Sequence, residues 1–348
     1  MASVTIKDVA RVAQVSVATV SRALNGHSNV AEAVRNRVMV AARDLRYTPH
    51  AAARSLSSRR THTLGVMLPD LYGEFFSELV RGVDQAAREH GLHLLVSSCH
   101  GHPEEQGAAL RAMRGRVDGL LVMSPYVAAP AAIADDLAAL PVVLINTQEA
   151  ADGIAADSMA ALNVDNYGGA VAMVEHLVAG GHRRIAFIAG PEDNFDAHER
   201  LRGYRDALAR GLPDVKEWIL PGDFDEASGH RAGLALVAAP TRPDAVFAAN
   251  DMMALGCLFA LFQAGIRVPD DIALAGFDDI PLARYVHPSL TTMRVNIAEI
   301  GDRAVRMLLQ QLGNPSGERA GRVVMKAELI ARDSSAARHP RRSRTNNS

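Results

Sequence analysis

Cysteine and long apolar runs are both scarce in this 348-residue chain. Its two cysteines, Cys99 and Cys257, lie far apart without a metal-type spacing, and we expect reduced, buried thiols of a cytosolic protein. No N-terminal apolar run follows a basic start, and no stretch approaches the roughly 18 apolar residues of a membrane span. The composition therefore argues against a disulfide scaffold and a membrane protein, and a soluble, cytoplasmic protein is expected.

Catalytic signatures are missing as well. The chain has no Walker loop, no GxSxG and no HExxH segment. Residues 100–107, HGHPEEQG, contain two His and two Glu, but a surface loop explains their spacing better than a metal site does. We therefore expect no enzyme, no metal and no cofactor. A polar cleft in such a chain would bind a ligand without transforming it.

Positive charge is concentrated at the two ends of the chain. Residues 1–60 carry a net charge of +7 and the last 18 residues carry +4, so the intervening 270 residues carry −13. A basic head on an acidic body favours a head that meets a polyanion and a body that does not. A solvated basic face would give the same pattern, so the charge alone does not decide the function.

Hydrophobic periodicity divides the chain into four parts. Residues 1–46 show short helical repeats and no strand, and residues 47–62 form a linker with a helical segment. Residues 63–332 alternate helices with short, unalternating apolar strands such as LGVML, GLLVMS and AVFAAN, which is typical of parallel sheets covered on both faces. Residues 333–348 lack apolar periodicity and are expected to be a disordered basic tail.

The body contains a weak internal repeat. RGVDQAAREHGL at residues 81–92 resembles RGYRDALARGL at residues 202–212, and each follows an apolar strand and a loop. Two similar α/β units predict two lobes with a cleft between them. Ligands of open parallel sheets bind outside the carboxyl ends of the strands, so the loops after the strands should line this cleft.

Residues 8–26, DVARVAQVSVATVSRALNG, have the pattern of a helix-turn-helix. Two short helices are separated by Gln14 and Val15, and Ser16 stands at the N-cap of the second. That helix turns Val17, Ala18 and Arg22 outward, where apolar side chains can meet thymine methyls and an arginine can bond guanine O6 and N7. A small structural helical domain is the less favoured alternative. The head residues expected at DNA are Thr5, Ser16, Val17, Ala18, Thr19, Ser21, Arg22 and Asn25.

The segment TIKDVARVAQVSVATVSRALNG, residues 5–26, resembles the N-terminal signature of the lac repressor/galactose repressor family of bacterial regulators. The body motifs RRIAFIAGP, RLRGY, PDAVFAANDMMALG and GIRVPDDIALAGFDDI also resemble family motifs, so the likeness spans about residues 5–332. It implies a small all-α helix-turn-helix head and an α/β body of two parallel-sheet lobes, like a periplasmic sugar-binding protein. One departure is Gln14, where the family usually has Gly.

The linker segment TPHAAARSL, residues 48–56, carries Thr and Pro as helix-start signals. It is shorter than the roughly 12–15 residues that an isolated helix needs in water, so we expect it to fold only when paired in a dimer on DNA. The resemblance implies that the paired hinge helices enter the minor groove through Ala53, Arg54 and Leu56, with Leu56 as an apolar wedge. A linker residue packed on its own body is the alternative for Leu56.

The resemblance also implies effector positions in the body, which combine aromatic faces with amide, carboxylate and guanidinium groups suited to sugar rings. These positions are Phe75, Phe76, Asn146, Asp165, Asp196, Arg200, Phe224, Asn250 and Asp278. Each could instead be a core, capping or turn residue. The purine-responsive branch would be expected to show Arg and Thr in the loop that holds residues 194–196, so a sugar, sugar acid or polyol is favoured over a purine.

The sequence thus predicts a repressor that binds a palindromic double-stranded DNA operator as a homodimer and responds to a small hydroxylated effector. Because the tail lacks leucine heptads, no tetramer is expected. A purine- or nucleoside-responsive regulator of the same family is the first alternative. A solute-binding protein without DNA function is the second, and the basic head opposes it.

Overall fold

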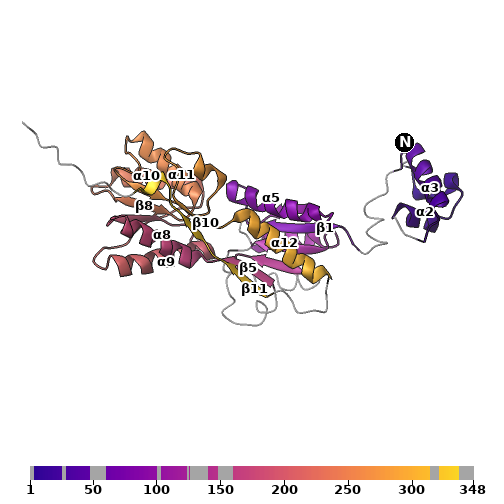
Figure 1. Ribbon diagram of the computed structural model, residues 1–348, viewed down its shortest axis with the longest axis horizontal. Helices are drawn as coiled ribbons and strands as arrows, with labels where there is room; N and C mark the ends of the chain where they lie inside the picture. The colour runs from indigo at the N-terminus through magenta and orange to yellow at the C-terminus, as the bar shows by residue number, and fades with distance from the viewer. Residues whose placement is uncertain are drawn as a thin grey trace, which may run out of the picture. The chain divides into compact units, whose positions relative to one another are not determined.

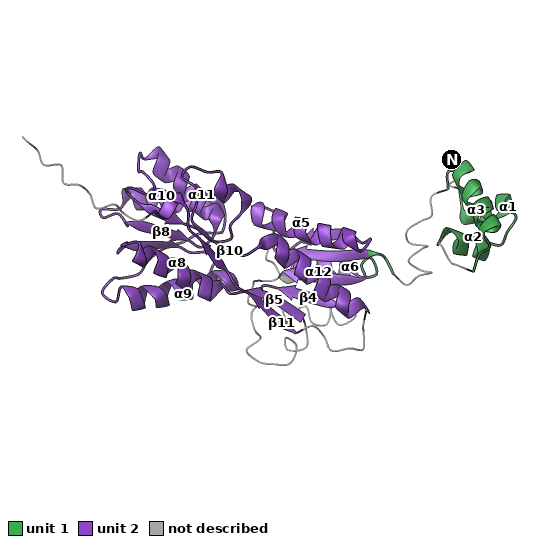
Figure 2. Cartoon of the chain, in the orientation of Figure 1, with its two compact units in different colours: residues 1–62, 115–117 green, residues 63–114, 118–348 purple. Residues whose placement is uncertain are grey.

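The computed structural model describes residues 4–25, 29–47, 60–99, 103–123, 125, 140–147, 160–313 and 321–336. The chain forms two compact units, one made of residues 1–62 with 115–117 and the other of the rest (Figure 2). The first contains the helical head, and the second contains the α/β body.

The head is a three-helix unit built around nine buried apolar side chains. Its helices are α1 (Ile6–Ala13), α2 (Val17–Leu24) and α3 (Glu32–Asp44). Val9, Val20 and Val38 are fully buried, one from each helix. Gln14 has a left-handed backbone at φ 53°, so the turn has the conformation that glycine adopts most readily.

The first lobe of the body is a six-stranded parallel sheet of order β11-β5-β4-β3-β1-β2 (Figure 1). Helices α5 and α12 pack together on this sheet, and α6 packs on β1 and β2. The strands are β1 (Thr63–Leu68), β2 (His93–Ser98), β3 (Gly119–Met123), β4 (Val142–Ile145), β5 (Ala160–Val164) and β11 (Arg322–Met325). The helices are α5 (Glu74–Glu89), α6 (Pro103–Met113) and α12 (Ile297–Gly313).

The second lobe is a four-stranded parallel sheet of order β7-β6-β8-β9, with α10 and α11 above it and α8 and α9 below it in Figure 1. The strands are β6 (Ile185–Ile188), β7 (Trp218–Leu220), β8 (Ala245–Ala248) and β9 (Ala273–Ala275). The helices are α8 (Asn166–Ala179), α9 (Phe195–Gly211), α10 (Glu226–Ala238) and α11 (Asp251–Gln263). The predicted architecture, an all-α head and a two-lobed α/β body, is confirmed.

The chain passes between the lobes at the junctions β5–α8, β10–α12 and β11–β12. Strands β10 (Thr292–Arg294) and β12 (Glu328–Ile330) pair antiparallel, so two of the crossings run side by side as a ribbon (Figure 1). Such narrow connections allow two lobes to change their relative angle, because a few residues at a crossing absorb the motion.

Glycines let α10 and α11 approach backbone to backbone. A Cβ on Gly256 would lie 1.9 Å from the Glu226 carbonyl oxygen, and one on Gly229 would lie 2.1 Å from that of Met253. Real Cβ atoms do not come so close, so each position requires glycine for packing.

The sequence prediction was wrong about the start of the tail. Residues 333–336 are ordered, and Asp333–Ser335 form a short 3-10 helix. Buried Ser334 donates to the Leu274 carbonyl (2.6 Å) and accepts from the Thr291 amide (2.8 Å). Apolar periodicity could not reveal this segment because its anchors are serines. Residues 337–348 lie outside the described part of the chain.

Candidate functional site

The outer side of α2 carries the side chains expected to face DNA. Val17 is 40 % exposed, and Ala18 and Arg22 are exposed as well, whereas Val20 and Ala23 face the core of the head. Exposed Val17 and Ala18 at the start of α2 and exposed Arg22 in its last turn are side chains that a major groove can accommodate.

The hydroxyl residues of the head hold the two helix starts. The Ser16 hydroxyl accepts from the Thr19 amide (3.1 Å) and caps α2. The backbone and hydroxyl of Thr5 donate to Asp8 at 3.0 and 2.8 Å, and these bonds, with a bond from Arg11, lower the pKa of Asp8 to about 2. The structure therefore gives Thr5 and Ser16 a capping role, and both are also exposed enough to meet a phosphate. Half-buried Ser21 and exposed Asn25 lie in the last turn of α2 and at its C-cap.

The three hinge positions, Ala53, Arg54 and Leu56, lie outside the described residues. Their predicted contacts with the minor groove stay a prediction.

A cavity of about 220 Å³ lies between the two lobes of the body. Seven of the nine expected effector residues line it: Phe75, Phe76, Asp196, Arg200, Phe224, Asn250 and Asp278. First-lobe and second-lobe residues face each other across this cavity, which we call the cleft. Its position agrees with the rule that ligands of parallel sheets lie beyond the carboxyl ends of the strands.

Several of these residues lie in helices where the sequence predicted loops. Phe75 and Phe76 are in the first turn of α5, Asp196 is in the first turn of α9, and Arg200 is one turn further on. Asn250 caps α11 by accepting from the Met253 amide (2.9 Å). Helix α11 starts three residues after β8 ends, whereas loops of five and six residues precede α5 and α9. The cleft is therefore lined both by these loops and by helix N-terminal turns, which hold side chains more rigidly than loops do.

Arg200 is the buried cation of the cleft, with 4 % of its surface exposed. Its Nε donates to Asn166 Oδ1 (2.8 Å), and its Nη1 donates to the Ala249 carbonyl (2.6 Å). Its Nη2 is 3.3 Å from Asp278 Oδ1, and the guanidinium carbon lies 3.9 Å from the centre of the Phe277 ring. A buried guanidinium that is hydrogen-bonded at two nitrogens and ion-paired at the third is a fixed part of the wall.

Asp196 links the two lobes beside the cleft through hydrogen bonds. Its carboxylate accepts from Asn146 Nδ2 (2.9 Å), which follows β4 of the first lobe, and from Asn166 Nδ2 (2.8 Å), which begins α8. Asn146 therefore contributes an interlobe hydrogen bond and does not line the cavity. Asn166 was missed by the sequence analysis, because an Asn directly after a strand reads as an ordinary helix start.

Asp165 does not reach the cleft, contrary to the prediction. Its carboxylate accepts from the Gly168 amide (2.8 Å) and caps α8. The residue that the prediction did not foresee at the rim is Tyr72, whose hydroxyl donates to Glu226 Oε2 (3.0 Å) in α10. This bond joins the two lobes at the mouth of the cleft.

Burial raises the pKa of three aspartates of the body. Burial raises the pKa of Asp278 to about 7 and that of Asp196 to about 6, and Arg200 opposes both shifts. Burial also raises the pKa of Asp251, and the neighbouring Asp278 adds to it. Asp196 and Asp278 share the one guanidinium of Arg200, and burial makes it costly for both carboxyls to be ionised, so a bound proton is favoured on Asp278 near neutral pH.

This stored proton predicts how stability depends on pH. Because the folded-state pKa of Asp278 lies above its unfolded value of about 4, the folded protein binds the extra proton, and the stability that this carboxyl contributes is lost as pH rises from about 4 through 7. Asp278→Asn removes this loss. We expect the melting temperature of the variant to rise relative to wild type across that window. A difference that stays constant from pH 4 to 8 in thermal unfolding scans would contradict the assignment.

Comparison with known proteins agrees with this geometry. Residues 5–50 match the model of the bacterial regulatory proteins of the lacI family, and residues 174–335 match a periplasmic binding protein-like domain. The chain is 37 % identical over 336 residues to the HTH-type transcriptional repressor CytR of Escherichia coli K12, which covers 96 % of each protein. It is 39 % identical over 319 residues to the ribose operon repressor of the same strain, covering 90 % of this chain and 94 % of that protein. The chain belongs to the LacI family.

Solved structures support the family assignment over the whole chain. The lac repressor dimer bound to operator and the anti-inducer ONPF has a TM-score of 0.85 and 28 % identity, covering 97 % of this chain and 100 % of that chain. A complex of the transcriptional regulator CelR with cellobiose has a TM-score of 0.69 and 32 % identity, covering 95 % and 99 %.

As a LacI-family transcriptional regulator, the protein carries the DNA-binding domain in its head, and its relatives are named as repressors rather than enzymes. In the described ranges no group of three His, Cys, Asp or Glu side chains is arranged to hold a metal ion. The motif HGHPEEQG was predicted to be a loop, but its part from Pro103 onward lies in α6. None of the described helices is long and apolar enough to cross a membrane.

Proposed function

We propose that this regulator is a repressor that binds a near-palindromic operator as a homodimer and is controlled by a small, hydroxylated effector in the cleft. Control by an effector is supported by the cleft, which is lined by aromatic rings and a buried carboxylate from the two lobes. Operator binding is supported by the exposed side of α2.

The chemistry of the cleft suits a ring with hydroxyl groups. Asp278 is 3 % exposed, and its Oδ1 atom accepts no hydrogen bond of good geometry, although Arg200 lies 3.3 Å away. A ligand hydroxyl would supply the missing donor. Phe75 and Phe224 offer faces for the C–H side of a sugar ring. The cellobiose complex of a relative shows that a carbohydrate can be bound by a protein of this family.

Net charge in the cleft opposes a sugar acid. Its lining includes five acidic side chains, Asp70, Asp196, Asp223, Asp225 and Asp278, against one arginine, Arg200. Asp223 is paired with Arg231 at 3.1 Å, and the raised pKa of Asp278, about 7, lowers its charge at neutral pH, but acidic groups still outnumber the cation. A ligand carboxylate or phosphate would be repelled by this excess of acidic groups. Neutral sugars and polyols are therefore favoured over the sugar acids that the sequence also allowed.

The effector class is tested by a thermal-shift screen on the full-length protein. A ligand present at 100 times its Kd stabilises the folded state by about 2.7 kcal/mol. We expect a shift with a neutral sugar or polyol and none with the matching sugar acid. A shift with purines or nucleosides alone would favour the alternative branch of the family.

DNA binding is tested by a band-shift assay. We expect affinity for a palindromic operator that falls steeply with salt, because phosphate contacts release counterions. No affinity for any palindromic sequence at low salt would contradict the regulator, and it would leave a solute-binding protein as the better interpretation.

Arg22 is proposed to read one base pair. Arg22→Ala should weaken operator binding by about 1–3 kcal/mol and relax the preference at that single position. Competition among operator variants measures this. The matched control is Arg11→Ala on α1, whose guanidinium is 2.7 Å from Asp8 and which is not expected at the bases. A loss from Arg22→Ala that is the same for every sequence would make Arg22 a phosphate contact.

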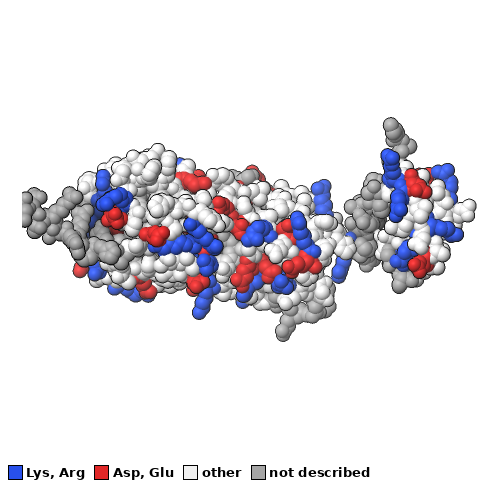
Figure 3. Space-filling model, turned by 45° about the horizontal axis from the view of Figure 1, so that its top comes forward, with Lys and Arg blue, Asp and Glu red and all other residues white. Residues whose placement is uncertain are grey.

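We further propose that the homodimer forms through the outer face of α10 and α11. Leu234, Phe259 and Phe262 are 46 %, 55 % and 75 % exposed, and the rings of His230 and Phe259 lie 5.7 Å apart between their centres. Charged side chains gather along the middle of the body in Figure 3, whereas the end that carries α10 and α11 shows broad uncharged areas. Exposed phenylalanines at adjacent helix positions mark a protein interface.

A further inference from the structure

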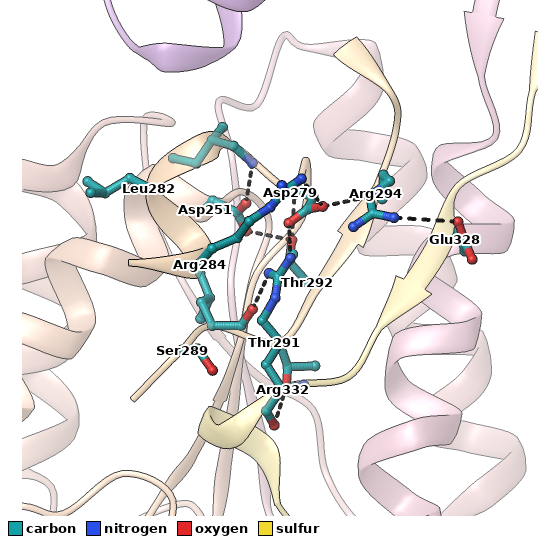
Figure 4. Close-up of polar contacts among 12 residues, drawn as sticks. Asp251, Asp279, Leu282, Arg284, Ser289, Thr291, Thr292, Arg294, Glu328 and Arg332 are labelled. Carbon is teal, nitrogen blue, oxygen red and sulfur yellow. Dashed lines mark hydrogen bonds and ion pairs between the residues drawn. The ribbon is translucent and has the colours of Figure 1, made fainter. Parts of the chain in front are cut away.

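Asp279 is the buried centre of an ion cluster beside the cleft, and the arginines around it reach outward to the surface (Figure 4). Its side chain is 1 % exposed, and the guanidinium groups of three arginines point toward it. Arg332 donates to Oδ1 at 2.5 Å, Arg294 donates to Oδ2 at 2.7 Å, and Arg284 lies 3.6 Å from Oδ2. Asp279 does not line the cleft.

The two short contacts join both strands of the crossover ribbon. Arg294 is the last residue of β10, and Arg332 follows the end of β12. Arg332 also donates to the Leu290 carbonyl (2.7 Å), just before β10, and Arg294 lies 4.0 Å from Glu328 of β12. One carboxylate therefore holds the two crossing segments together, with a different oxygen for each.

The same loop carries the effector carboxylate. Asp278 precedes Asp279, its amide donates to the Met293 carbonyl of β10 (2.8 Å), and the Asp279 amide donates to the Thr292 hydroxyl (3.3 Å). That hydroxyl donates to Asp251 Oδ1 (2.6 Å), and the Ile280 amide donates to Asp251 Oδ2 (3.0 Å). The loop of residues 278–280, which carries a cleft-lining residue, is therefore hydrogen-bonded to β10 of the ribbon.

The backbone of this loop is strained, so it needs these contacts. Asp278 has φ 119° and Asp279 has φ 57°. Non-glycine residues with positive φ are disfavoured and persist where surrounding contacts hold them. Burial alone would raise the pKa of Asp279, but the bonds from Arg332 and Arg294 outweigh it and lower the pKa, so the carboxylate stays charged.

We propose that Asp279 is the positioning residue that couples the effector to DNA: it fixes the Asp278 loop to the β10–β12 ribbon, so that a ligand drawn to Asp278 changes the angle between the lobes. This inference rests on the proposed function. Because Asp279 does not line the cleft, we expect it to act without touching the ligand. Without its charge, three guanidinium groups meet no central anion and repel one another. The loop then keeps only its bonds to Met293 and Thr292 of β10, and its link to Arg332 beyond β12 is weakened.

The test compares wild type with Asp279→Asn, which keeps the shape and removes the charge. Operator Kd is measured with and without a ligand, using D-ribose, D-glucose, cellobiose and adenosine as probes, and the ligand Kd is measured by calorimetry. In wild type, the active probe should change operator Kd by about 5- to 150-fold. In Asp279→Asn we expect a change of less than about threefold, with ligand Kd altered by less than about tenfold.

The matched control is Glu328→Gln, since Glu328 is the exposed outer partner of Arg294. The ligand should change the operator Kd of this variant by the same factor as in wild type. If Asp279→Asn loses too much stability to purify, Arg294→Gln removes one of the two short bonds while leaving Arg332 in place, and it should reduce this factor partway.

Two results would overturn the inference in distinguishable ways. In the first, a probe changes the operator Kd of wild type and of Asp279→Asn by the same factor. Asp279 would then have no coupling role, and the proposed function would be unaffected. A wild-type protein whose operator affinity no probe alters would contradict the proposed function and the inference with it.

Discussion

Replacing Arg200 with methionine is expected to lower the free energy of unfolding of the body by about 3–5 kcal/mol, because it leaves the buried Asp278 carboxyl and Asn166 without their partner. Trp218 is the single tryptophan of the chain and lies in β7 of the second lobe. Its fluorescence in a urea titration therefore reports on the lobe that contains Arg200. Effector binding should be lost in the same variant.

The control is Arg205→Met on the same helix. Arg205 pairs with Glu217 at 2.7 Å, and both side chains are 49 % exposed. An exposed pair contributes little to stability, so this variant should unfold at nearly the wild-type urea concentration. Adding Asp278→Asn to Arg200→Met removes the orphaned acid and should restore part of the loss. If Arg200→Met and Arg205→Met cost the same, Arg200 is not the buried cation that the structure shows.

The double variant Phe259→Asp, Phe262→Asp is expected to be monomeric and to lose high-affinity operator binding. Aromatic anchors at the centre of an interface contribute about 2–4 kcal/mol each, and two introduced carboxylates would repel their symmetry mates. A dimer that binds two half-sites loses the advantage of linked binding when it dissociates. Sedimentation velocity measures the oligomeric state, and a band shift measures the operator affinity.

Val324→Asp is the matched control, since Val324 is 58 % exposed on β11 at an edge of the first-lobe sheet, far from α10 and α11 in the sequence. It should leave both the dimer and the operator affinity intact. Dimers that persist in the Phe259→Asp, Phe262→Asp variant would place the interface on another face.

Much of the head could be predicted because local rules decide it. The 3.6-residue period separates buried Val20 and Ala23 from exposed Val17 and Arg22. The N-cap preference of serine fixes the start of α2 at Ser16. These rules act within a few residues of the chain, so one sequence is enough to apply them.

The cleft could be predicted only in outline. The rule for parallel strands predicted where the cleft lies. The family resemblance supplied its residues, and seven of the nine line the cavity. The short strand β7 and the ribbon strands β10 and β12 were not foreseen, because three residues carry little pattern by themselves. The equally short β9 was recognised because apolar residues on both sides extend it to the run IALAGF. Asp165 and Asp196 were both expected at the effector. In the structure Asp165 caps α8, whereas Asp196 accepts a hydrogen bond from Asn146 of the other lobe.

One sequence was enough to predict the helix-turn-helix, the alternation of strands and helices, and the family that the chain resembles. These follow from local periodicity, capping and continuous motifs. Only the tertiary structure decided that Arg200 binds Asn166 and Asp278, and that Asp279 gathers Arg284, Arg294 and Arg332 from separate segments. Buried charges are satisfied by partners distant in the chain, and their pairing depends on how the lobes and crossings pack, which no local pattern records.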